Sequence, residues 1–73
     1  MRGSIEQYVR QEGDERIIDR DIIGEKIQAN DGSNTGQVLS VSRDAGGEYI
    51  TVKGPEGIYG IRIPVFKFYQ LIE

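Results

Sequence analysis

The side chains best suited to bind a ligand lie in the run Asn30-Asp31-Gly32-Ser33-Asn34, where oxygen-bearing residues surround a glycine. Oxygen ligands at alternate positions are typical of calcium loops. An EF-hand, however, also needs a glutamate at its twelfth position and a helix on each side. Neither is evident in this chain, and Asn, Asp and Gly also tolerate the positive φ of a tight turn. We therefore interpret the run as a turn, and we expect no metal site.

Acidic residues are also frequent before this run, and paired carboxylates can transfer protons or bind Mg²⁺ or Ca²⁺. The acidic residues are Asp14, Glu15, Asp19, Asp21 and Glu25. They alternate with Arg16, Arg20 and Lys26, which is typical of a solvated surface crossed by salt bridges. We predict such a surface here rather than a catalytic centre.

The chain contains no histidine and no cysteine. It therefore lacks the commonest general base near neutral pH and has neither a thiolate nor a disulfide. Its serines have no evident base to activate them, and there is no glycine-rich phosphate loop with a lysine. We expect no catalytic residue, no cofactor and no enzymatic activity.

Size and charge narrow the remaining classes of function. Seventy-three residues make one domain, and a core this small is often helped by self-association. The net charge is −3, from 9 basic and 12 acidic residues, which disfavours broad phosphate-driven binding to nucleic acid. No apolar run is long enough to span a bilayer or to form a signal peptide. We expect a cytoplasmic protein that does not insert into a membrane.

The first fifteen residues are expected to form an N-terminal arm, helical or extended. Ser4 can cap a short helix over residues 4–12, with Gln7 completing a capping box and Ile5, Tyr8 and Val9 on one face. So short a helix is unstable unless it docks. The arm therefore either packs on the rest of the protein or on a partner, or frays. Met1-Arg2-Gly3-Ser4 also resembles the start of an expression tag.

Residues 16–73 read as short strands separated by turns, which predicts an all-β fold: a small antiparallel β-barrel of SH3-like size. Asp21-Ile22-Ile23-Gly24 is expected to be a single turn ended by Gly24 in a left-handed conformation. The later turns are Asn30-Asp31-Gly32, Asp44-Ala45-Gly46-Gly47 and Gly54-Pro55-Glu56-Gly57.

Alternation along the strands predicts which residues face inward. Ile50 and Val52 are expected to point into the core. Leu39 and Val41 are expected on one face of their strand, with Val38, Ser40 and Ser42 on the other. Tyr59, Ile61, Ile63 and Val65 are expected to share a face opposite Arg62. Pro64 should end strand pairing, residues 66–68 should form a 3₁₀-like turn, and residues 69–72 should form the last strand.

Several of these features together resemble the PRC-barrel superfamily. They are Gly24-x-x-Ile27, Asp31-Gly32, Gly36-x-Val38, a strand that ends near Val52, and Ile63-Pro64-Val65. The resemblance covers residues 17–73, and its motifs are short and mostly structural. The chain departs from the pattern at Phe66, Phe68 and Tyr69, which follow where such barrels usually carry a polar or small residue.

The resemblance implies a docking module without catalytic residues. Barrels of this type bind other proteins, pair with themselves or sit on ribonucleoprotein, and some archaeal stand-alone members act as cell-division adaptors. It therefore implies an adaptor that forms a homodimer or higher homo-oligomer, in a cell-division or membrane-associated assembly.

We expect the contact surface to lie mainly in the aromatic-rich C-terminal part, with help from the arm. The expected contact residues are Tyr8, Val9, Tyr59, Phe66, Phe68, Tyr69 and Leu71. Aromatic residues dominate small cores as well as interfaces, so core packing is the alternative interpretation. A turn at residues 66–68 would splay Phe66 from Phe68 and leave at least one of them accessible.

An RNA- or ribosome-associated small barrel is the alternative function. Its binding patch would combine exposed aromatic and basic side chains. The residues are Tyr49, Lys53, Arg62 and Lys67, with at most three charges, so we expect weak and salt-sensitive binding.

Overall fold

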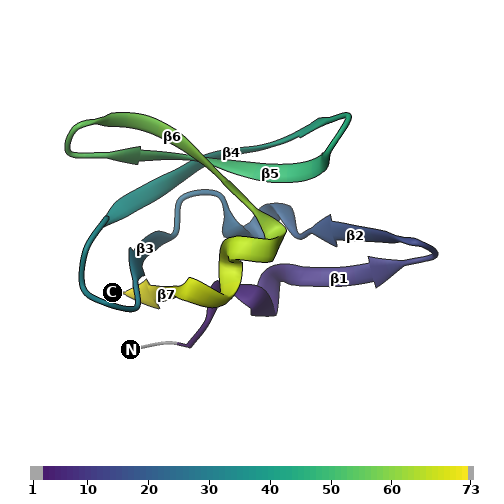
Figure 1. Ribbon diagram of the computed structural model, residues 1–73, viewed down its shortest axis with the longest axis horizontal. Coiled ribbons are helices and arrows are strands. Elements are labelled where there is room, and N and C mark those ends of the chain that lie inside the picture. Colours follow the sequence, from purple (N-terminus) through teal and green to yellow (C-terminus); the bar gives the residue numbers. More distant parts are fainter. Residues whose placement is uncertain (1–2, 73) are drawn as a thin grey trace.

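The computed structural model describes residues 3–72, which form two antiparallel sheets and three short 3₁₀ helices (Figure 1). The helices are η1 (Ile5–Tyr8), η2 (Arg20–Ile22) and η3 (Ile63–Phe68). The smaller sheet pairs β1 (Val9–Glu12) with β2 (Glu15–Ile18). The larger sheet contains β3 (Lys26–Ala29), β4 (Gly36–Asp44), β5 (Gly47–Gly54), β6 (Gly57–Arg62) and β7 (Tyr69–Ile72).

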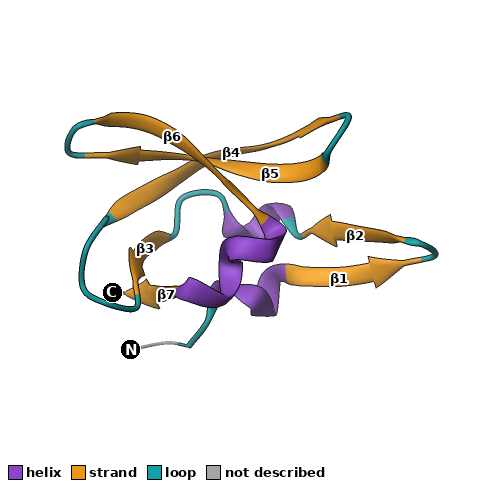
Figure 2. Ribbon diagram, viewed as in Figure 1, coloured by secondary structure: helices purple, strands orange, loops and turns teal. Residues whose placement is uncertain are grey.

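The strand order of the larger sheet is β6-β5-β4-β3-β7, so the predicted all-β fold is confirmed. The sheet is open, however, and the described strands do not close into the expected barrel. The reason is that η3 carries the chain away from β6, and β7 then pairs with the outer side of β3. Figure 2 shows the three helical turns gathered between the β1–β2 hairpin and the β3–β7 pair.

The turn that precedes β3 forms as the sequence predicts. η2 begins after Asp19, whose side chain accepts a hydrogen bond from the N–H of Asp21 at 2.9 Å. It is followed by Gly24 at φ +94°, a conformation that favours glycine. The N–H of Gly24 then donates to the carbonyl of Val38 at 2.8 Å, which aligns the chain for pairing with β4.

The predicted faces of β4 are wrong because this strand contains a β-bulge. Val38 pairs with Val52, but Ser40 pairs with Thr51, so Leu39 is an extra residue. Because one inserted residue reverses the alternation, Val38 and Val41 both lie on the face that packs on the core, and Leu39 is exposed. On β5, Ile50 and Val52 are buried as predicted.

The segment after β6 confirms the expected 3₁₀ turn and shows that it is longer. β6 ends at Arg62, and η3 begins at Ile63 with Pro64 in its first turn, so Pro64 ends the pairing as predicted. With three residues per turn, Ile63 and Phe66 lie on one side and are buried. Val65 lies off that side and is exposed, so its predicted inward position is wrong.

The N-terminal segment packs into the protein, and only part of it is helical. Ser4 caps η1 through a hydrogen bond from the Glu6 N–H at 3.1 Å, and Ile5 is completely buried. The expected helix over residues 4–12 is therefore too long, because residues 9–12 pair with β2 instead. The Gln7 side chain donates to the Ser4 carbonyl at 3.1 Å, which is opposite in direction to the bond that a capping box requires. Met1, Arg2 and Glu73 lie outside the described residues, and so does part of the tag-like start.

One apolar core joins the helices and the larger sheet. Its buried members are Ile5, Ile18, Ile22, Ile27, Val38, Ile50, Val52, Ile61, Ile63, Phe66 and Leu71. Each fully buried aliphatic or aromatic side chain of this kind stabilises the fold by roughly 1.5–3 kcal/mol. Because residues from η1, η2 and η3 contribute, the helical turns are part of the core and position the surface residues beside them.

Candidate interaction surface

The structure divides the predicted contact residues between core and surface. Phe66 is completely buried and Leu71 is 1 % exposed, so neither can contact a partner, and their assignment to the interface is wrong. Phe66 is buried because the period of η3 aligns it with Ile63. Leu71 is buried because it lies opposite Ile27 in the β3–β7 ladder, on the inward side of the sheet.

Four further predicted contact residues are only half-buried, and all four pack against the core: Tyr8, Val9, Tyr59 and Tyr69. The Tyr8 hydroxyl donates a hydrogen bond to Glu25 at 2.6 Å, which joins η1 to the segment before β3. These side chains can offer an edge to a partner, but most of their apolar surface already stabilises the monomer.

Phe68 is the one predicted contact residue that is largely exposed, at 56 %. It ends η3, where Phe66 points inward, so the expected splaying of these two side chains is confirmed. The Lys67 ammonium lies 5.3 Å from the centre of the Phe68 ring. With the exposed Val65, Phe68 forms a small apolar surface on η3.

Three further apolar residues are exposed and were not among the predicted contact residues: Ile23, Leu39 and Ile58. Ile58, at 65 %, is the most exposed large apolar residue in the described part of the chain. It pairs with Lys53 on the face of β6 opposite Tyr59 and Ile61. The alternation of Ile58-Tyr59-Gly60-Ile61 contained this signal, since Ile58 falls on the outward parity.

The two edges of the larger sheet differ in their surroundings. The outer edge of β7 is covered in part, because Ser4 forms a bridge with Gln70 and the Leu71 N–H donates to the Gly3 carbonyl at 2.8 Å. On the outer edge of β6, by contrast, no residue from 3 to 72 pairs with the strand. Every second residue of such an edge directs its N–H and C=O groups outward.

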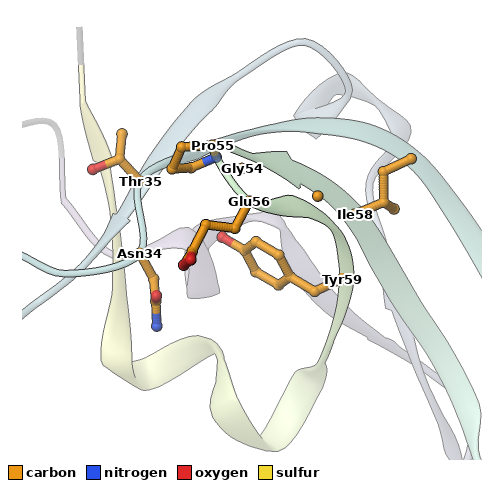
Figure 3. A pocket seen from close by; sticks show the side chains of 8 residues that line it. Asn34, Thr35, Gly54, Pro55, Glu56, Ile58 and Tyr59 are labelled. Atoms are coloured by element: carbon orange, nitrogen blue, oxygen red, sulfur yellow. The ribbon is translucent and has the colours of Figure 1, made fainter.

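A hollow of about 450 Å³ adjoins the start of β6 (Figure 3). Its lining comes from the segment before β4, from the β5–β6 turn and from the strand ends that flank this turn: Asn34, Thr35, Gly54, Pro55, Glu56, Gly57, Ile58 and Tyr59. In Figure 3 the hydroxyl end of Tyr59 and the carboxylate of Glu56 both extend toward the segment that carries Asn34 and Thr35.

Tyr59 itself fits against two glycines. A Cβ atom at Gly54 would lie 3.0 Å from the Tyr59 ring, and one at Gly36 would lie 3.1 Å from its hydroxyl. The hydroxyl oxygen is buried and has no hydrogen-bond partner among the described residues. Burial, with a smaller contribution from nearby Tyr69, raises the pKa of this hydroxyl. The group therefore stays protonated.

The structure brings three of the four predicted RNA-contacting residues to one face. Tyr49 pairs with Arg62 and Lys53 pairs with Ile58, so these side chains lie on the outward face of β5 and β6. The Arg62 guanidinium lies 4.9 Å from the centre of the Tyr49 ring. It also forms two hydrogen bonds with Asp44, which hold the pKa of that carboxyl below its usual range. Lys67 lies on η3 instead, beside Phe68.

Among residues 3–72 the most buried charged group is Glu48, whose side chain is 3 % exposed. Its carboxylate accepts hydrogen bonds from the Ile18 N–H at 2.7 Å, from Arg20 at 3.1 Å and from Arg43 at 3.2 Å. Burial is the largest single influence and opposes ionisation, but these donors together outweigh it and lower the pKa of Glu48. Glu48 therefore joins β2 to β5 as an ionised acceptor.

The salt-bridged surface predicted around the acidic residues is confirmed for Glu15 and Arg20. Glu15 contacts Arg43 at 2.7 Å, and Arg20 contacts Glu48. Arg43 therefore links an exposed carboxylate to a buried one.

The run from Asn30 to Asn34 forms a turn in which Asp31 bonds within its own loop. Its carboxylate accepts from the Ser33 hydroxyl at 2.6 Å and from the Ser33 N–H at 2.9 Å, which lowers its pKa. Residues 3–72 contain no group of three or more His, Cys, Asp or Glu side chains that could hold a metal ion. They also include no helix long and apolar enough to cross a membrane.

Comparisons with protein-family models, with curated proteins and with solved structures found no match to this chain. The resemblance to PRC barrels thus stays a prediction from the sequence motifs, and the candidate surface must be judged from its own geometry.

Proposed function

We propose that this protein is a non-enzymatic docking module that associates with itself. The observation that carries the proposal is the unpaired outer edge of β6, with Ile58 exposed beside it. An open strand edge presents backbone donors and acceptors that another protein can satisfy. An exposed apolar side chain beside it stabilises the complex when the partner buries it. Phe68 offers a second apolar contact on η3.

The finer features of the proposal come from the sequence motifs. We assign the fold to the PRC-barrel type in an open form, since Gly24, Gly32 and Pro64 stand at turns or strand ends, as that resemblance requires. From the same resemblance we propose an adaptor in a cell-division or membrane-associated assembly, and we keep the cytoplasmic location expected from the sequence as part of this proposal.

Sedimentation equilibrium tests self-association. The protein is examined from about 10 µM to about 1 mM, because contacts this small give weak affinities. We expect the mean mass to rise with concentration toward that of a dimer. A mass that stays at the monomer value over the whole range would contradict the proposal.

RNA binding is the second candidate, and the stacking of Arg62 on Tyr49 favours it. Such a pair can support an unpaired base. Asp44 offsets the charge of Arg62, however, so the remaining patch attracts phosphate weakly. A fluorescence titration with a short single-stranded RNA at low salt tests this function. Absence of any fluorescence change at high micromolar protein would exclude RNA binding.

A further inference from the structure

We propose that the hollow beside Tyr59 binds the side chain of an arginine in an exposed segment of a partner protein. The Glu56 carboxylate binds the guanidinium of this arginine, and Pro55 and Ile58 contact its aliphatic stem. The inference goes beyond self-association and does not depend on it, because each copy of the chain carries the whole hollow.

The hollow carries a negative charge that the chain itself does not neutralise. Glu56 is the charged residue of the lining, which includes neither lysine nor arginine. The Glu56 side chain forms no hydrogen bond or ion pair with any residue from 3 to 72. Lys53 pairs with Ile58 in the β5–β6 ladder but does not line the hollow. A cation is therefore the charge-complementary ligand.

Further acceptors favour a guanidinium over an ammonium ion. The side chains of Asn34 and Thr35 line the hollow from the segment before β4, and neither has a hydrogen-bond partner among the described residues. Figure 3 shows the Glu56 carboxylate extending from the β5–β6 turn toward this segment. The planar guanidinium has five N–H donors, so it can bond to the carboxylate and to an acceptor on the opposite side at once. An ammonium ion is a more compact point charge.

The remaining lining suits the apolar stem of an arginine. Ile58 is 65 % exposed, and Pro55 beside it is exposed as well. Arginine packs its methylene groups along such a surface while its charged end stays among polar groups. The Tyr59 ring also lines the hollow, and guanidinium groups stack on aromatic rings. At about 450 Å³, the hollow has room for the whole side chain.

The openness of the site selects a protein segment as the source of this arginine. Most of the lining residues are exposed: Asn34, Thr35, Pro55, Glu56, Gly57 and Ile58. Figure 1 shows the β5–β6 turn at one end of the molecule. Pockets for free small ligands usually bury roughly 70–90 % of the ligand surface, which a lining this exposed does not achieve. A side chain on a folded partner needs less enclosure, because its own chain already restricts it.

A nuclear magnetic resonance titration of the whole ¹⁵N-labelled protein tests the site, at a protein concentration at which the chain is monomeric. The probe is a short blocked peptide with a single arginine among alanines. Its matched control carries citrulline, which keeps the shape of the side chain and removes the charge. We expect the arginine peptide to shift the amide signals of residues 34–35 and 56–59 and to saturate them at roughly millimolar concentration.

The citrulline peptide should bind at least roughly fivefold more weakly, because a charge-assisted bond is replaced by a neutral one. A lysine peptide should also bind more weakly than the arginine peptide. Absence of saturable shifts at residues 34–35 and 56–59, or equal binding of the arginine and citrulline peptides, would overturn the proposal.

A pair of variants tests the role of Glu56. Glu56→Gln should weaken binding of the arginine peptide at least roughly fivefold. Asp14→Asn is the matched control, since Asp14 is an exposed carboxylate in the β1–β2 turn that lines a different hollow. This control should leave binding unchanged. Equal losses in the two variants would indicate general attraction to an acidic protein and would overturn the site.

A blocked single arginine distinguishes the two sources of the ligand. Tighter binding of the peptide supports a protein segment, and equal binding overturns that source in favour of a small guanidinium compound. The outcomes also separate this inference from self-association. A protein that is monomeric at every concentration but binds the peptide contradicts self-association alone. A protein that dimerises at high concentration but does not bind the peptide as a monomer contradicts the arginine site alone.

Discussion

The two edge strands of the larger sheet differ in whether other residues of the chain cover them. β7 is flanked by the chain itself, through Gly3 and Ser4. The outer edge of β6 has no strand or bridge beside it in the described part of the chain. The covered edge lies beside Ile5 and η1, which belong to the core, whereas the open edge lies beside the exposed Ile58.

This difference indicates that the segment that covers the β7 edge also contributes to the core. The residues that cover β7 lead directly into η1, and η1 packs against η2 and η3. The outer edge of β6 has no such neighbour, and β5 is the strand with which β6 pairs among the described residues. Substitutions on the covered side should therefore affect folding, and substitutions on the open side should affect association.

The largest effect is expected for Ile5→Ala on the covered side. Ile5 is completely buried, and truncation of such a side chain costs about 3 kcal/mol in transfer and cavity terms. Urea denaturation measures the loss. Ile58→Ala is the matched control on the open side, and its free energy of unfolding should change by no more than about 0.5 kcal/mol. Equal costs for both substitutions would remove the distinction between the two edges.

The next effect concerns Glu48, which holds the β1–β2 hairpin, and with it the N-terminal segment, against β5. Glu48→Gln replaces a buried carboxylate with a neutral amide and should cost about 2 kcal/mol, because the bonds from Ile18, Arg20 and Arg43 weaken. Glu15→Gln is the control, since it alters an exposed partner of the same Arg43. Thermal denaturation at neutral pH compares them, and a larger loss in Glu15→Gln would refute the central role of Glu48.

The loss of stability caused by Glu48→Gln is expected to depend on pH. The folded protein lowers the pKa of Glu48 below its usual value of 4.5. Its carboxylate therefore stabilises the fold fully above that pH, and the contribution is lost as the pH falls through the lowered pKa. The difference in stability between wild type and Glu48→Gln should thus shrink on acidification. A difference that grows toward low pH would contradict this sign.

The smallest effect is a gain in stability on the open side of the sheet, from the substitution Tyr59→Phe. The Tyr59 hydroxyl is buried without a partner, and such a group costs about 1 kcal/mol or more. Removal of the oxygen should raise the free energy of unfolding by about 1 kcal/mol, measured by urea denaturation. Tyr69→Phe is the control, because it removes the hydroxyl from a half-buried tyrosine on the covered edge strand. A loss of stability in Tyr59→Phe would show that its hydroxyl has a role in the fold.

Local chemistry made much of the fold predictable from the sequence. The turns at Gly24 and Gly32, the end of β6 before Pro64 and the final strand all follow from residue types with narrow backbone preferences. The inward faces of Ile50 and Val52 follow from simple alternation along a regular strand.

The errors occur where tertiary contacts override a local period. The extra residue at Leu39 reverses the faces of β4, and alternation alone cannot reveal a bulge. Residues 9–12 have a helical pattern, but their backbone groups pair with β2. Short strands and turns do not specify which strand the last strand pairs with. The sequence therefore could not distinguish the expected closed barrel from the open sheet that forms.

The candidate surface was predicted only at Phe68. A turn over residues 66–68 was expected to splay Phe66 from Phe68, but η3 already begins at Ile63, and its period of three aligns Phe66 with the buried Ile63. Ile58 is not aromatic, and strand parity is the feature of the sequence that indicates its outward position. The open edge itself follows from strand order, which only the three-dimensional structure supplies.

The strand order also has a consequence for the time course of folding. β4, β5 and β6 are joined by two short turns, so this part of the sheet forms from contacts between near neighbours in the sequence. β7 must cross to β3, and residues 3–4 must meet residues 70–71 from the other end of the chain. Because distant contacts form slowly, we expect the β4–β6 meander to appear first and the meeting of the two chain ends to limit the rate.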